Sequence, residues 1–124
     1  MNIRTLSLVL RVLFWVQLLL GILFWFGVAT GLVLVHMLIG IAFVAVLWLL
    51  GVVNGLRGGS LGLVLGTFVV GLLLAIVGLT QTRILLGSAH WVIQVIHLLL
   101  ALVAIGMAEM IAAQARRAAR MSAA

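Results

Sequence analysis

The feature that most constrains this chain is an uncharged stretch that covers residues 12–56, 45 positions in all. A transmembrane helix needs about 20 mainly apolar residues, so the stretch is long enough for two crossings. The rest of the chain is similar, because 68% of the 124 residues are hydrophobic and only 6% are charged. A soluble domain has about 45–50% apolar and about 25% charged residues. This composition excludes a water-soluble globular enzyme, a disordered chain and a nucleic-acid-binding domain.

Glycine-rich and polar segments divide the apolar sequence into four predicted spans. Turns are expected near residues 27–31, at 54–60 and in the polar stretch after Thr80. No proline interrupts the spans. The sequence therefore predicts an all-α fold, an integral membrane up-down four-helix bundle in which residues 1–124 form a single membrane domain. The predicted spans cover about residues 8–27, 32–53, 61–79 and 91–113.

The arginines predict how the bundle is oriented. All seven basic residues are arginines, and six of them fall on one side if the N-terminus is cytoplasmic, leaving only Arg83 outside. Cytoplasmic loops carry the excess of positive charge, so both termini are predicted to face the cytoplasm. The lipid bilayer is therefore an expected partner of the chain. The small size of the chain and the general character of its sequence favour a prokaryotic plasma membrane. The six are Arg4, Arg11, Arg57, Arg116, Arg117 and Arg120.

Two histidines lie inside predicted spans, where polar side chains are rare and often functional. His36 lies about four residues (roughly 6 Å) from the outer end of its span, and His97 about six residues (roughly 9 Å). Spans two and four run in the same direction and are diagonal partners in an up-down bundle. The two imidazoles therefore reach nearly the same level, which predicts that His36 and His97 bind one haem iron from opposite sides.

Other residues on the same faces are candidates for contacts with the haem. Gly40 and Ala101 lie one turn from the two histidines and leave space for a macrocycle. His90 lies two turns above His97, and with Arg83 it is a candidate contact for the haem propionates, since guanidinium suits carboxylates. The alternative for His90 and Arg83 is a solvated interfacial loop.

Several other interpretations stay open. The histidines can simply hydrogen-bond to a neighbouring helix, bind another metal or relay protons; zinc would need a further ligand, for which His90 is a candidate. Glu109, the one acidic residue, is expected to form a structural ion pair with Arg11 or Arg57. A stripe of small residues is expected to pack within the bundle, with a dimer interface as the alternative. The stripe comprises Ala101, Ala104, Ala108 and Ala112.

The stretches around these histidines resemble one half of the haem A synthase family. Each half of those proteins is a four-helix membrane bundle whose second and fourth helices carry a haem-facing histidine. The similar segments here are VQLLLGILFW, VLVHMLIGIAF and VIQVIHLLLALVAIG. The resemblance implies haem binding, and a full-length arrangement would require a homodimer. Loop 28–31 lacks the acidic residue that the synthases have in their first outer loop and the cysteine pair that they often have there.

These observations favour a membrane-embedded b-type cytochrome that holds haem b between His36 and His97. Its expected role is electron transfer near the outer face, with quinol or a redox protein as partner. One alternative is a single-half, haem-modifying enzyme related to the synthases. Another is a structural or accessory membrane subunit without haem. No nucleic acid is expected among its partners.

Overall fold

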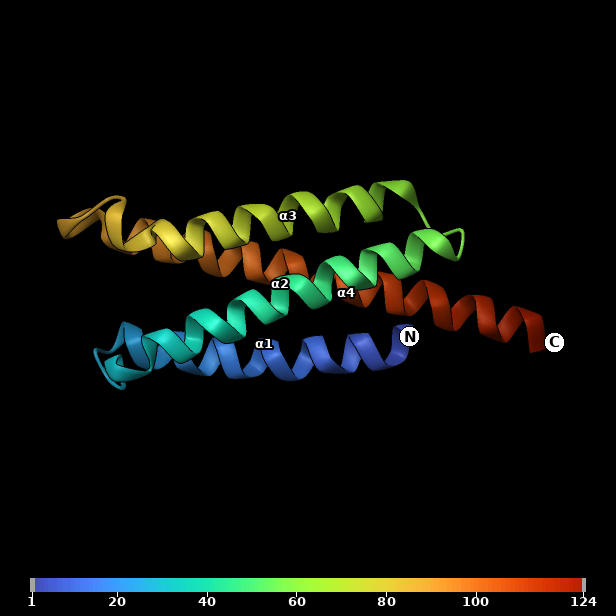
Figure 1. The fold of residues 1–124 in the computed structure, drawn as a ribbon, viewed down its shortest axis with the longest axis horizontal. Helices are drawn as coiled ribbons and strands as arrows, with labels where there is room; N and C mark the ends of the chain where they lie inside the picture. Colours follow the sequence, from blue (N-terminus) through green and yellow to red (C-terminus); the bar gives the residue numbers. More distant parts are fainter. Residues whose placement is uncertain (1, 124) are drawn as a thin grey trace.

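The computed structural model describes residues 2–123, which form four long helices (Figure 1). Each of the four is long and apolar enough to cross a membrane, so the predicted all-α, four-helix architecture is confirmed. Both described ends of the chain lie at one end of the bundle; the opposite end, which carries the α1–α2 and α3–α4 connections, is called the far end below. The helices are α1 (Ile3–Trp25), α2 (Val33–Leu56), α3 (Leu61–Thr80) and α4 (His90–Ala123).

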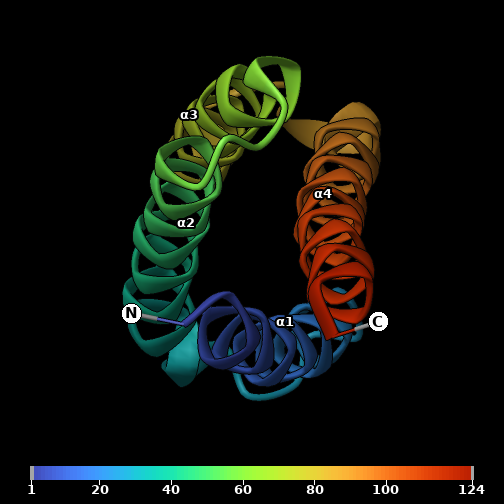
Figure 2. The same cartoon turned by 90° about the vertical axis from the view of Figure 1, so that its right-hand side faces the viewer.

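The helices form a closed ring in chain order. Each helix packs against the next, and α4 packs back against α1 (Figure 2). Neighbouring helices run in opposite directions, as short connections require. Helices α2 and α4 consequently face each other across the ring, which is the diagonal relation that the sequence predicted.

The observed helices extend beyond the predicted spans at several ends. Helix α1 begins at Ile3 because the Asn2 side chain accepts a hydrogen bond from the backbone N–H of Arg4 at 3.1 Å and caps the helix. Helix α4 continues to Ala123, so the arginine- and alanine-rich tail prolongs the helix as expected. Charged residues limit a membrane span, but arginine and alanine are good helix formers and do not end the helix.

Left-handed backbone conformations close the connections. Gly27 has φ +70° after α1, Gly58 has φ +76° after α2, and Gly87 has φ +81° before α4. Glycine adopts this conformation without steric cost, which explains why the predicted turns fall at these positions. Short 3-10 helices at Thr30–Leu32, Gln81–Arg83 and Gly87–Ala89 complete the two far-end connections.

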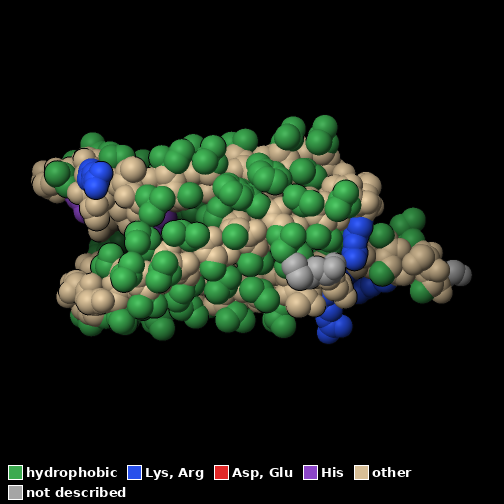
Figure 3. Space-filling model, in the orientation of Figure 1, with side chains coloured by type: hydrophobic (Ala, Val, Ile, Leu, Met, Phe, Trp, Pro, Cys, Tyr) green, Lys and Arg blue, Asp and Glu red, His purple; other side chains and the backbone are tan. Residues whose placement is uncertain are grey.

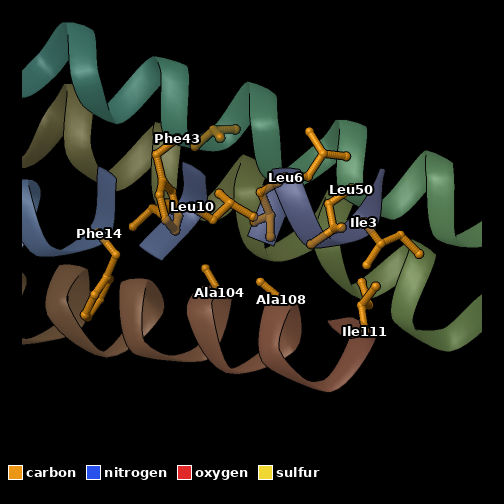
Figure 4. Packing of buried hydrophobic residues seen from close by; sticks show 12 residues of the cluster. Ile3, Leu6, Leu10, Phe14, Phe43, Leu50, Ala104, Ala108 and Ile111 are labelled. Atoms are coloured by element: carbon orange, nitrogen blue, oxygen red, sulfur yellow. The ribbon is translucent and has the colours of Figure 1, made fainter. Parts of the chain in front are cut away.

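The buried apolar core lies mainly in the half of the bundle near the termini (Figure 4). Its largest fully buried apolar side chains belong to Leu10, Leu47, Leu50 and Ile111. Ala104 and Ala108 are completely buried and allow α4 to approach its neighbours closely. The predicted small-residue stripe therefore packs within the bundle.

Large apolar side chains also cover the sides of the bundle. In Figure 3, hydrophobic side chains spread over the visible face, while most of the visible arginine gathers at the end near the termini. On α1 alone, Leu8, Val12, Trp15 and Leu19 are each more than half exposed. Exposed apolar surface this continuous is typical of a protein that contacts lipid or another apolar partner.

Candidate functional site

A cavity of about 560 Å³ lies in the far half of the bundle. Its volume falls in the range of about 300–1,000 Å³ that is typical of ligand and cofactor sites. All four helices contribute to its lining, which is mostly apolar, and Figure 3 shows histidine side chains beside a hollow near this end. Small residues widen the cavity: Gly21, Gly40, Ala75, Gly78 and Ala101.

The two histidines that the sequence singled out face each other across this cavity. His36 lies on α2 and His97 on α4, and both line the cavity. Their ring centroids are 6.4 Å apart, and the ring planes are inclined by 55°. The ring of Phe24 on α1 packs edge-on against His36, with centroids 5.3 Å apart. The diagonal geometry thus brings two imidazoles together in an apolar setting.

Neither imidazole forms a hydrogen bond to a neighbouring helix. The Nδ1 atoms of His36 and His97 are both buried and have no hydrogen-bond partner, and neither ring forms a hydrogen bond with any other residue in the described range 2–123. A buried polar atom without a partner costs about 1–3 kcal/mol. The expectation that these histidines simply hydrogen-bond to a neighbouring helix therefore has no contact to support it.

Gln17 on α1 is also part of the site, although no role was predicted for it. Its Nε2 donates a hydrogen bond of 2.9 Å to the backbone carbonyl oxygen of His36, while its Oε1 is buried without a partner. Gly40 makes room for this amide, since a Cβ at that position would lie 2.8 Å from Gln17 Nε2. An amide within an apolar span is the signal that points to this residue.

Two glycines on the other helices allow close approach to the imidazoles. A Cβ on Gly78 of α3 would lie only 2.9 Å from Cε1 of His97, and one on Gly21 of α1 would lie 4.0 Å from Cε1 of His36. Neither glycine was predicted to contact a histidine. Glycine inside a helix costs about 1 kcal/mol relative to alanine, so its presence in an apolar span indicates a close contact.

The remaining predicted contacts lie differently. Gly40 and Ala101 line the cavity with the two histidines, as expected. The lining residues do not include His90 or Arg83; His90 begins α4, and Arg83 ends a 3-10 helix. Their contact with haem propionates stays a prediction. The polar side chains that do line the cavity are Gln17, Gln81, Thr82 and Gln94, besides the histidines.

The only acidic side chain lies outside the cavity. Glu109 on α4 accepts two hydrogen bonds from Arg11 on α1, 2.5 Å from Nε and 2.7 Å from Nη2. The predicted structural ion pair is confirmed, and its partner is Arg11. No carboxylate therefore appears among the lining residues of the cavity.

The described part of the chain also lacks a conventional cluster of metal ligands. No group of three or more His, Cys, Asp or Glu side chains within residues 2–123 is arranged to hold a metal ion. The additional ligand that zinc would need beside His36 and His97 is not supplied by His90. The cavity offers two imidazoles as possible metal ligands, one from α2 and one from α4.

Comparison with known proteins adds no relative. No protein-family model, curated protein or solved structure matches this chain. The resemblance to one half of the haem A synthases thus stays a prediction.

Proposed function

We propose that the chain is an integral membrane b-type cytochrome that binds one haem between α2 and α4. The observation that carries the proposal is the 6.4 Å between the ring centroids of His36 and His97. A metal–nitrogen bond measures about 2 Å, and a ring nitrogen lies about 1.1 Å from the imidazole centre, so two imidazoles on opposite sides of one metal have centroids about 6 Å apart. The observed separation fits that arrangement.

The number of protein ligands supports haem over a bare metal ion. Two imidazoles alone do not complete the coordination of zinc, whereas a haem iron would need only His36 and His97 from the protein. A bound haem supplies one-electron chemistry at its iron, with a potential that depends on ligand identity and burial. The apolar lining of the cavity suits the faces of a macrocycle.

The other residues of the cavity hold and shape the site. Gln17 fixes the backbone of α2 at His36 through its hydrogen bond, and Gly78 lets α3 approach the ring of His97. The polar side chains of Gln81, Thr82 and Gln94 offer hydrogen bonds to carboxylate or water near the far end. His90 and Arg83 remain candidate contacts for the propionates.

The position of the cavity favours electron transfer at the far end. Trp25 at the end of α1 and Gln81 at the end of α3 line the cavity, so it reaches the α1–α2 and α3–α4 connections. With cytoplasmic termini, the haem edge lies near the outer face, where quinol or a partner redox protein can exchange electrons with it. Both ligands come from one chain, so a homodimer is not needed to complete the site.

Optical spectra of the purified protein and three variants test the proposal. Reduced wild-type protein is expected to show sharp b-type absorption bands, and His36→Ala or His97→Ala is expected to remove most of the bound haem. His90→Ala serves as the control for the removal of an imidazole. His90 does not line the cavity, and loss of a propionate contact would leave both iron ligands in place, so most of the haem should remain. Wild-type protein that contains no haem, or ligand variants that keep it fully, would contradict the proposal.

A further inference from the structure

A second cavity, of about 410 Å³, lies between α1 and α4 near the termini. It is separate from the histidine cavity and shares no lining residue with it. Three of its lining side chains are arginines, Arg4, Arg11 and Arg116. The remaining lining residues are small or apolar: Ile3, Ser7, Ala112, Ala115 and Ala119.

The cavity carries unneutralised positive charge. Arg11 is paired with Glu109, and Glu109 is the one acidic residue of the chain. The guanidinium of Arg4 forms no hydrogen bond or ion pair within the described part of the chain, and Arg116 has only a longer-range electrostatic interaction with the same Glu109. The hydroxyl of Ser7 already donates to the carbonyl oxygen of Ile3 at 2.8 Å. The guanidinium groups of Arg4 and Arg116 can therefore both donate hydrogen bonds to an anion.

We propose that this cavity binds the phosphate group of an anionic phospholipid headgroup. Guanidinium groups match phosphate oxygens in charge and in planar, two-point geometry. Basic pockets between transmembrane helices on the cytoplasmic side are sites where anionic headgroups bind. Three arginines line the cavity and only Glu109 offsets them, so a phosphate with at least one negative charge reduces the positive charge that remains.

An apolar stripe next to the cavity favours a lipid over soluble phosphate. Leu8, Val12 and Trp15 follow Arg4 on α1 at intervals of three or four residues, which places them on one side of the helix. They are 58%, 57% and 65% exposed. An acyl chain whose headgroup sits at Arg4 therefore has an apolar surface to follow. The inference rests on the proposed membrane location and is independent of haem.

Native mass spectrometry of the detergent-solubilised protein tests the inference. The probes are phosphatidylglycerol, phosphatidylcholine with the same acyl chains, and inorganic phosphate. The protein is expected to bind phosphatidylglycerol in preference to phosphatidylcholine, and Arg4→Gln/Arg116→Gln is expected to weaken that binding about tenfold or more. Arg117→Gln/Arg120→Gln is the matched control, because it removes the same charge from residues that do not line the cavity.

Three results would overturn the inference. One is equal affinity for the two lipids, and another is an equal loss of binding in the control variant. The third is inorganic phosphate that competes as well as the lipid does. If Arg4→Gln/Arg116→Gln does not fold, Glu109→Gln gives a second test: it frees Arg11 and is expected to tighten phosphatidylglycerol binding, and unchanged or weaker binding contradicts the inference. Haem content is measured in the same samples. It tests the proposed function separately, because the two cavities share no lining residue.

Discussion

At the scale of single residues, the site depends on the two imidazoles and on the absence of side chains and hydrogen bonds around them. Glycines face both rings, and neither ring donates or accepts a hydrogen bond within the described residues. Interiors are packed closely enough that one added methyl group is felt. The position of His97 should therefore respond to a change on α3, although α3 supplies no ligand.

Gly78→Ala tests this dependence. Its Cβ would lie 2.9 Å from Cε1 of His97, so the ring or the helix must shift, and we expect a lower haem content or a shifted absorption spectrum. Gly106→Ala is the control, because a Cβ there meets no atom within 4 Å. The measurement is haem per protein after purification. Equal haem content together with identical absorption spectra in both variants would contradict the role assigned to Gly78.

Part of the site could be predicted at this scale and part could not. Equal depth on parallel spans was enough to pair His36 with His97, because depth follows from helical rise alone. The roles of Gln17 and Gly78 depend on how α1 and α3 are rotated, which an almost uniformly apolar sequence does not encode. The same uniformity hid the fact that His90 and Arg83 do not line the cavity.

At the scale of helices, the α2–α3 contact shows how bulky side chains fit against glycines. The indole of Trp48 on α2 lies against Gly71 on α3 and stacks on Phe68, with ring centroids 5.6 Å apart. Gly51 on α2 similarly accepts the side chain of Thr67 on α3. Small residues let helices approach closely where no hydrophobic effect drives them together.

Gly71→Ala is expected to destabilise this pair of helices. Alanine favours the helix by about 1 kcal/mol over glycine, but overpacking costs about 1–3 kcal/mol, so the net change is a loss of up to about 2 kcal/mol. Gly62→Ala on the same helix is the control, since its Cβ would make only an ordinary contact of 3.5 Å with Ser60 Oγ. The midpoint of thermal or detergent-induced unfolding measures the difference. A Gly71→Ala variant as stable as the control would be evidence against this packing.

The positions of the helices were predicted well from the sequence, and the residues at which they begin and end were predicted less well. Uncharged apolar runs and glycine turns located all four helices, because length and hydropathy alone define a possible span. The first residue of α1 and the last of α4 depend on local capping and helix propensity, which continue a helix beyond its apolar part. Consequently the observed α1 starts at Ile3 rather than near residue 8.

At the scale of the whole molecule, the bundle has two different halves. The half near the termini holds most of the close-packed core and the Arg11–Glu109 pair. The far half holds the histidine cavity. The packed half keeps the helices in register, and the far half leaves the cavity in which we propose that haem binds.

The proposed topology can be tested with single cysteines, since the chain has none. Ser88→Cys, in the exposed α3–α4 connection, is expected to react with a membrane-impermeant thiol reagent in intact cells. Ser60→Cys and Ser122→Cys, which are also exposed, should react only after lysis. The opposite labelling pattern would invert the orientation that the arginines indicate.

Ligation of one iron by His36 and His97 is tested by the electron paramagnetic resonance spectra of the oxidised wild-type protein and of His97→Ala. Two histidines on one iron fill both axial positions, so we expect a low-spin ferric signal from the wild type. The fraction of His97→Ala that retains haem should become high-spin, and added imidazole should restore the low-spin signal. A high-spin wild type, or a low-spin signal that persists unchanged without His97, would contradict ligation by His36 and His97.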